Sequence, residues 1–427
     1  MTSIPGIASI WNVKRTNSFG ITLIVLLILV GHSSTIHADS SPAVDQVESN
    51  LKMNASERQN VVNNMLAKPL TIKDAELVAF LNANNIYARY YDLQLHITDA
   101  QQGLAITNPS VGFGIIADRS NSRTELTIEQ DLMGWILHGT KASWVDALTK
   151  AQIMEFSQAF LEFSTTLKKA YYSYLAAQEA HLIQANYADA AKATFDLQKR
   201  QYKAGTINEL QLKLGEVTVQ NTIFELQKSE LTLAQLRLDL QLAMGLDPNQ
   251  TEWKIEGKLR EAVPKIPTLT ELDTLIDTKR LDIAAIRFRI TAEENRLDAQ
   301  ELQDKIGSLK AGFIVAQDID GKKTISPKVE VGIPLFNQGQ LSQSKKNQAT
   351  RQLSETMEDA KLKAQYSVRK LVTQLEYEHQ QIIQIKTHLI PLHDKVADLT
   401  QAHYNNLLAG TYALIESRQE ELNARQA

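Results

Sequence analysis

Tyr202-Lys-Ala-Gly-Thr-Ile-Asn-Glu-Leu210 interrupts the longest helix-like tract of the sequence. Residues 140–204 contain neither glycine nor proline, and a helix of that length would run roughly 100 Å at 1.5 Å per residue. Glycine favours the left-handed conformation that often ends a helix, so Gly205 predicts a helix end. Thr206 or Asn208 can cap the helix that follows. The sequence therefore predicts a long helical hairpin with its tip at Gly205.

A similar stretch, Tyr404-Asn-Asn-Leu-Leu-Ala-Gly-Thr-Tyr-Ala-Leu414, predicts a second tip. We align Gly410 with Gly205 and expect both positions to need a glycine-like backbone. The helix before this tip contains Pro391, which removes one backbone hydrogen bond and marks either a hinge or a tolerated bend. The final helix is expected to be short, reaching about 25 Å back from its tip against about 60 Å in the first hairpin.

Two segments have the period of β-strands, at about 111–132 and about 309–335. Alternate positions are apolar in each segment, which predicts hairpins with one apolar and one polar face. Aligning Leu132 with Leu335 gives a repeat period of about 200 residues, which indicates a duplicated half rather than a short solenoid unit. We expect a mainly α protein with a small β part, built from two similar halves.

The N-terminus is typical of a secretory signal peptide. Lys14 and Arg15 precede an apolar run from Ile21 to Val30, and Ile36-His-Ala38 is a plausible cleavage site. The alternative is an uncleaved anchor. The predicted organisation is a signal peptide 1–38, a flexible segment 39–68, a first repeat 69–248, an irregular connection 249–268 and a second repeat 269–427.

Composition excludes several functions. The 427-residue chain has a formal net charge of −4 and no cysteine, so it offers no electrostatic case for nucleic-acid binding and no thiol chemistry. The histidines of the second half lack the i, i+4 spacing of two ligands on one helix face: His379, His388, His393 and His403. The sequence has no phosphate-binding loop, nucleophile elbow or metalloprotease signature. We predict no enzyme, no cofactor and no metal site.

Four strands per chain leave two open sheet edges. A sheet in a lipid core must close into a barrel, and three copies of the chain would supply twelve strands. The alternative is a small surface sheet packed on helices.

Several motifs, in this order along the chain, resemble one family. They are Pro69-Leu-Thr-Ile-x-x-Ala75, Asn108-Pro109, Tyr202-x-x-Gly205, Met244-Gly-Leu246, Lys279-Arg-Leu-Asp-Ile283, Ile333-Pro-Leu-Phe-Asn-Gln-Gly-Gln340, and Pro391 followed by Tyr404 and Gly410. Together they resemble the TolC-like outer-membrane efflux factors, especially the CzcC-like heavy-metal branch. The chain departs from some relatives in lacking a lipoprotein cysteine, and Trp135-Ile-Leu-His138 replaces the Pro-Leu-Phe pattern in the first half.

The resemblance implies a homotrimer in the outer membrane of a Gram-negative bacterium, with a large periplasmic part. Its strands would form a twelve-stranded transmembrane β-barrel and its helical hairpins an α-barrel tunnel. The implied partners are a periplasmic adaptor, an inner-membrane RND-type pump and outer-membrane lipid. The implied function is passive export of metal cations or small toxic compounds. Alternatives are a duct for protein secretion or for drugs, and a periplasmic structural coiled-coil protein without channel activity.

The resemblance also implies site residues. The tips would dock the adaptor through Tyr202, Gly205, Thr206, Tyr404, Gly410 and Thr411. The family's gating rings often have an acid six residues after the tip glycine, where this chain has Gln211 and Glu416. Glu209 is a possible substitute for the missing first acid.

Overall fold

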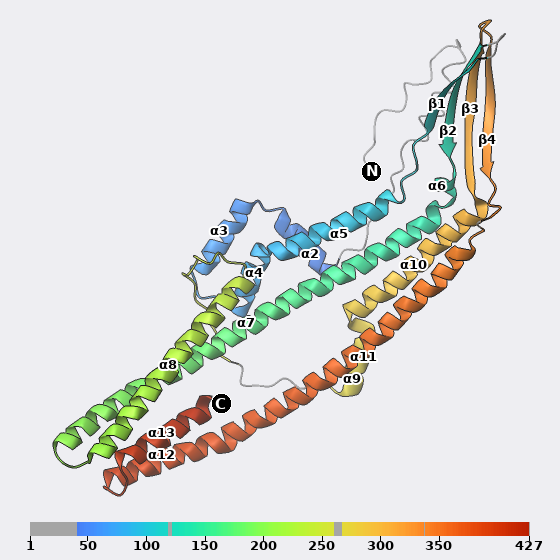
Figure 1. The fold of residues 1–427 in the computed structure, drawn as a ribbon. Coiled ribbons are helices and arrows are strands. Elements are labelled where there is room, and N and C mark those ends of the chain that lie inside the picture. Colours follow the sequence, from blue (N-terminus) through green and yellow to red (C-terminus); the bar gives the residue numbers. More distant parts are fainter. Residues whose placement is uncertain (1–40, 118–121, 260–266, 337, 427) are drawn as a thin grey trace, which may run out of the picture. The chain divides into compact units, whose positions relative to one another are not determined.

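The computed structural model of the chain describes residues 41–117, 122–259, 267–336 and 338–426 (Figure 1). The predicted signal peptide 1–38 lies outside these ranges. The first half contains α2 (Pro42–Leu51), α3 (Ala55–Leu66), α4 (Ile72–Asn82), α5 (Asn84–Gln102), β1 (Ser110–Ala117), β2 (Ser122–Asp131), α6 (Met133–Ile136), α7 (His138–Lys203) and α8 (Glu209–Ala243). The second half contains α9 (Leu269–Lys279), α10 (Leu281–Ile306), β3 (Ser308–Asp318), β4 (Lys323–Gly332), α11 (Gln340–Gln384), a π-helical turn (Ile385–Leu389), α12 (Ile390–Asn405) and α13 (Thr411–Gln426).

The segment 39–68 is not the flexible segment that we expected, because its described part forms α2 and α3. Ser41 caps α2, and Asn54 and Glu57 form a reciprocal capping box at the start of α3. Val44 and Val47 are buried on the inner face of α2, which contacts α5 and α7. One narrow apolar face is therefore enough to order a segment that is polar on average.

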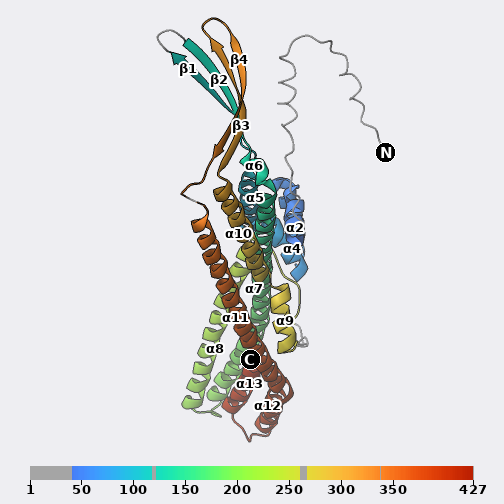
Figure 2. The same ribbon diagram turned by 90° about the vertical axis from the view of Figure 1, so that its right-hand side faces the viewer.

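The predicted strands form one antiparallel sheet with the order β1-β2-β3-β4 (Figure 2). Neighbouring strands are paired residue by residue, so successive rows across the sheet lie on opposite faces. One such row contains Phe113, Leu126, Val315 and Ile325. The edges of β1 and β4 have no partner within the described part of the chain.

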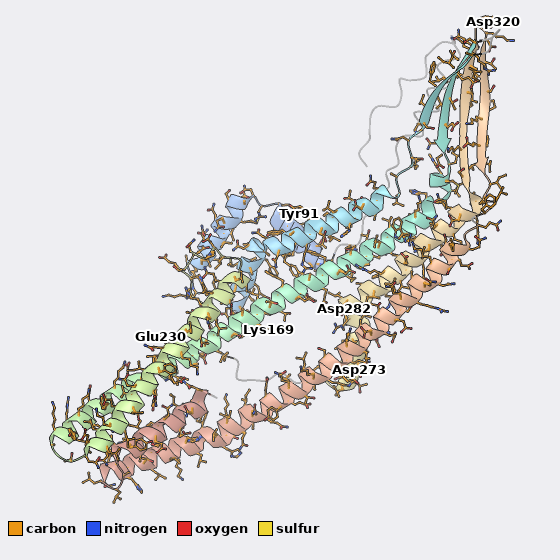
Figure 3. All side chains as sticks on the ribbon, viewed as in Figure 1. Tyr91, Lys169, Glu230, Asp273, Asp282 and Asp320 are labelled. Atoms are coloured by element: carbon orange, nitrogen blue, oxygen red, sulfur yellow. The ribbon has the colours of Figure 1, made fainter. Side chains whose placement is uncertain are left out.

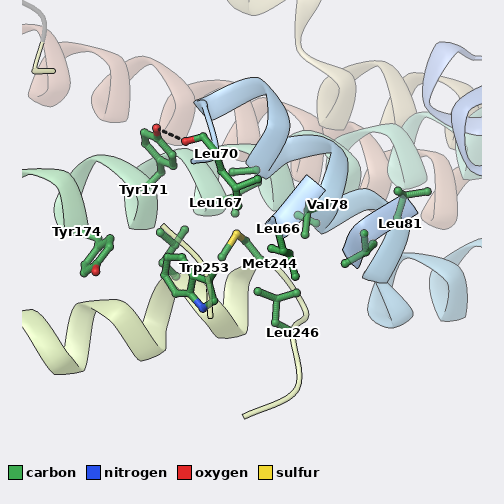
Figure 4. Close-up of a cluster of buried hydrophobic side chains, with 14 of the residues drawn as sticks. Leu66, Leu70, Val78, Leu81, Leu167, Tyr171, Tyr174, Met244, Leu246 and Trp253 are labelled. Carbon is green, nitrogen blue, oxygen red and sulfur yellow. Dashed lines mark hydrogen bonds between the residues drawn. The ribbon is translucent and has the colours of Figure 1, made fainter. Parts of the chain in front are cut away.

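The main hydrophobic core lies where the N-terminal helices, α7, the end of α8 and the connection 249–259 meet (Figure 4). The buried Tyr171 hydroxyl donates hydrogen bonds to the carbonyl oxygens of Leu70, at 3.0 Å, and Glu256, at 2.5 Å. Leu70 and Ile255 form an isolated parallel bridge, and residues 249–259 of the connection are otherwise irregular; residues 260–266 of the predicted connection lie outside the described ranges. This core fixes the middle of α7 to both ends of the first half.

The long helices pack as pairs. α7 packs against α8 and α10, and α11 packs against α10 and α9. α12 and α13 form the second hairpin, held by an ion pair between Arg425 and Asp394 at 2.7 Å. No helix in the described part of the chain is both long and apolar enough to cross a membrane.

The proline in the second long helical tract is accommodated by a local change of helix type. Ile390 donates its backbone N–H to the carbonyl oxygen of Ile385, the i→i−5 bond of a π-turn, directly before Pro391. Proline has no N–H to donate, and the extra residue in the π-turn accommodates this missing hydrogen bond. The helix therefore continues past Pro391 as α12 rather than ending there.

Candidate functional site

The first tip has the predicted glycine end. Gly205 has a φ of 73° and donates its N–H to the carbonyl oxygen of Tyr202 at 2.9 Å. Both the N–H and the hydroxyl of Thr206 donate to the carbonyl oxygen of Gln201 at 2.9 Å. Of the two predicted caps, Asn208 is the one that caps α8, through a reciprocal pair of hydrogen bonds with Gln211.

The second tip has the same backbone but a different residue at its left-handed position. Leu407, with a φ of 61°, donates to the carbonyl oxygen of Tyr404 at 3.0 Å, and Leu408 donates to that of His403 at 2.8 Å. These bonds repeat those of the first tip, so Leu407 corresponds to Gly205.

Our alignment of Gly410 with Gly205 is therefore wrong. Gly410 is not among the described glycines with positive φ, and it corresponds instead to Asn208, directly before the returning helix. The spacing of glycines in the sequence pointed to the wrong register, because leucine occupies the left-handed position of the second tip.

One side chain links the two tips. The amide nitrogen of Gln201 donates to the hydroxyl of Tyr404 at 3.2 Å, and its amide oxygen accepts from the hydroxyl of Thr411 at 3.3 Å. The structure thus brings together Tyr404 and Thr411 from the second tip with the end of α7. The sequence analysis did not identify Gln201, because it is one of many glutamines on this helix. Its position directly before Tyr202 was the one indication that it belongs to the tip.

The three candidate gate residues occupy different settings. Gln211 is engaged in the cap of α8, whereas Glu209 begins that helix next to the Lys213–Glu216 ion pair at 2.9 Å. The hydrogen bond that the ammonium group of Lys213 donates to Glu216 raises the pKa of Lys213, and the negative charges of Glu216 and Glu209 raise it further. The same bond lowers the pKa of the Glu216 carboxyl. The cation of Lys213 therefore offsets part of the acidic charge at the first tip.

Glu416 lies on the exposed part of α13 and lines a cleft of about 420 Å³ between α13 and the α7–α8 hairpin. Glu225 and Glu420 line the same cleft. Glu209 is not among the residues that line this cleft, so the cleft does not bring Glu416 and Glu209 together.

The sheet presents two chemically different faces. On one face, apolar side chains such as Phe113 and Val329 are 71% and 69% exposed. On the other face, the ammonium group of Lys328 pairs with Glu129 and, at 3.1 Å, with Glu330. Asp320, labelled in Figure 3, lies in the turn that joins β3 and β4. Exposed apolar side chains on one face and ion pairs on the other are the reverse of a sheet packed on a protein core.

α8 also carries an uncovered apolar stripe. Every seventh residue is a large apolar side chain exposed to solvent: Leu210, Val217, Phe224, Leu231 and Leu238. A spacing of seven keeps these side chains on one side of the helix, as in a coiled coil. Within the described part of the chain, no helix covers this stripe.

The described residues contain no group of three histidine, aspartate or glutamate side chains that could hold a metal ion. The candidate functional features are therefore surfaces: two linked tips, an exposed apolar stripe and a sheet with one apolar and one polar face.

No protein-family model and no curated protein matches the sequence. Solved structures do match the fold. A membrane protein from Pseudomonas aeruginosa has a TM-score of 0.66 at 14% identity, over 83% of this chain and 87% of that one. The channel protein CusC has a TM-score of 0.64 at 15% identity, with the same two coverages. The outer membrane protein VceC of Vibrio cholerae has a TM-score of 0.63 at 14% identity, over 87% of this chain and 91% of that one. The chain therefore has a fold found in outer-membrane channel proteins, which are not enzymes.

Proposed function

We propose that the chain is the outer-membrane channel of a tripartite efflux system and a member of the TolC-like family, acting as a passive export duct. The observation that carries this proposal is the sheet with an exposed apolar face, an ion-paired polar face and two open edges. An open edge cannot persist in a lipid core, and an exposed apolar face is stable against lipid. The shared fold with outer-membrane channels supports the same function.

The working form is a homotrimer. β4 of each copy pairs with β1 of the next, so that three four-stranded sheets close into one twelve-stranded barrel with the apolar face outward. The α8 stripe packs against a helix of the neighbouring copy, because each large apolar side chain contributes roughly 1.5–3 kcal/mol when it leaves water. The helices of the three copies then form the periplasmic tunnel.

The two tips dock the periplasmic adaptor, which connects the duct to an RND-type pump of the inner membrane. Since α7 runs from His138, beside the sheet, to Lys203 at the first tip, the tips lie roughly 100 Å from the sheet. Tyr202, Gly205 and Thr206 form one docking tip. Tyr404 and Thr411 belong to the other, together with Leu407 and Leu408, whose side chains are 93% and 74% exposed.

The cargo that we propose is metal cations or small toxic compounds. The resemblance of the sequence motifs to the heavy-metal branch supports this class. A channel for drugs or for secreted proteins would use the same duct, so deletion of the gene followed by metal, drug and secretion phenotypes decides the cargo.

Fractionation combined with single-channel recording tests the duct. The full chain, expressed with its leader, is expected in the outer-membrane fraction, and the purified protein is expected to conduct ions in a planar bilayer. A protein found in the soluble periplasm, without conductance, would instead be a structural coiled-coil protein.

A further inference from the structure

The polar face of the sheet carries an unequal set of charges. Alternate positions of the paired strands place eight charged side chains on this face, five acidic and three basic: Arg123, Glu125, Glu129, Asp131, Lys310, Asp318, Lys328 and Glu330. The opposite face of the described strands has one charged residue, Lys323, the first residue of β4. The polar face therefore has two more negative than positive charges per chain.

The first group of charges surrounds Lys328. Its ammonium group pairs with Glu330 on its own strand and with Glu129, which lies two strands away on β2. The residue between them in this row is Gly312 on β3, so no side chain separates the two partners. A Cβ added at Gly312 would collide with the carbonyl oxygen of Ile128. The glycine therefore lets one lysine join acids across three strands.

The same group includes the row of Asp131, Lys310 and Glu330. The ammonium group of Lys310 lies 3.5 Å from Glu330. The carboxylate of Asp131 accepts a hydrogen bond from the backbone N–H of Met133 at 2.8 Å. No ion pair between Asp131 and a basic side chain is recorded among the described residues. Two lysines thus face three carboxylates at the helical end of the sheet.

The second group lies near the turns at the other end of the sheet. The guanidinium group of Arg123 is 3.2 Å from Glu125 and 4.0 Å from Asp318. One cation faces two carboxylates, so this group also keeps one uncompensated negative charge.

From these charges we propose that the barrel lumen selects cations over anions. The proposal rests on the proposed function, because the polar face becomes a lumen only when the barrel closes. Three chains then contribute two acidic rings, one at each end of the barrel, and each ring holds one uncompensated negative charge per chain. Charged rings around a pore attract ions of opposite sign and repel ions of the same sign.

In this arrangement Lys328 and Arg123 determine how strong the selectivity is. Each basic side chain is held between acids by ion pairs, so it lowers the negative potential of its ring without abolishing it. Removing either cation makes the ring more negative, and removing its acidic partners makes the ring neutral or positive.

The test is the reversal potential of the purified full-length protein in a planar bilayer under a KCl gradient. The wild type is expected to pass K⁺ in preference to Cl⁻. Combined Glu129→Gln and Glu330→Gln should lower the K⁺/Cl⁻ permeability ratio by about twofold or more, whereas Arg123→Gln should raise it. Lys323→Gln, on the apolar face, is the matched control and should leave the ratio unchanged.

Each outcome has a distinct meaning. Wild-type conductance with a preference for Cl⁻, or an unchanged ratio in both lumen variants, would overturn the selectivity proposal and leave the duct intact. A wild-type protein that passes no current would overturn the duct itself. Circular dichroism and trimer content, compared with wild type, show whether the double variant has folded.

Discussion

Leu407 is the residue at which the two tips differ most in backbone energy. It is the one described residue other than glycine with a positive φ, and its side chain is 93% exposed. The left-handed conformation costs an L-residue roughly 1–2 kcal/mol, and so exposed a side chain gains little packing that could offset this cost. Retained strain at an exposed tip is typical of a binding position.

Replacing Leu407 by glycine is expected to change stability and adaptor docking in opposite directions. Leu407→Gly is expected to raise the free energy of unfolding by up to about 1 kcal/mol, offset in part by glycine's greater freedom in the unfolded chain. The same variant should weaken adaptor docking, because it removes the exposed side chain. Denaturant unfolding measures the first effect, and Gly205→Leu, which introduces the strain at the equivalent position, should lower stability. A destabilised Leu407→Gly protein would contradict the assignment of strain.

Gln201 is the residue that couples the tips. Gln201→Ala removes its side-chain hydrogen bonds to Tyr404 and Thr411, each worth roughly 0.5–1.5 kcal/mol. We expect the second tip to separate more often from the first, which single-channel recording would detect as a higher open probability. Gln419→Ala is a suitable control, since Gln419 bonds only to Asn423 on its own helix among the recorded hydrogen bonds. Unchanged gating in Gln201→Ala would show that this link does not hold the tip shut.

Residue types predicted part of this site. Gly205 and the cap at Asn208 followed from local backbone preferences, which act within a few residues. The register of the second tip did not, because a leucine can take the left-handed position when the strain is small compared with total stability. Gln201 was not predictable either, because its partners come from the other half of the chain.

At the scale of the elements, periodicity predicted the strands and long helices, since each has a continuous pattern over many residues. It missed α2 and α3, where short polar helices bury few side chains. The capping signals at Ser41 and Asn54 were the available evidence for them. Pro391 illustrates a further limit: the residue indicated a disturbance, but the π-turn before it depends on how the backbone redistributes its hydrogen bonds.

The α8 stripe gives the element-scale prediction. Phe224 is 65% exposed in a single chain and lies at the centre of the stripe. Phe224→Asp would place a charge in the proposed contact between copies, so the trimer is expected to dissociate in detergent, as measured by analytical ultracentrifugation. Thr232→Asp adds the same charge to the same helix away from the stripe and should leave trimers intact. Trimers that survive Phe224→Asp would place the contact on another helix.

In the whole molecule, no single element explains the exposed surfaces, but the proposed trimer would cover them together. The open strand edges, the apolar sheet face and the α8 stripe would all be costly in an isolated chain in water. The proposed closed trimer would pair the edges, expose the apolar face to lipid and bury the stripe. The duplicated halves supply the even number of strands that closure needs.

Disulfide cross-linking can show whether the barrel closes between copies, because the chain has no native cysteine that would compete. One cysteine is introduced in β1, at Val111, Phe113 or Ile115, and one in β4, at Ile325, Pro327 or Val329, and outer membranes carrying each pair are oxidised. At least one pair is expected to yield a covalent trimer on a denaturing gel and nothing larger. Monomers alone in every pair, or a ladder that continues beyond the trimer, would contradict it.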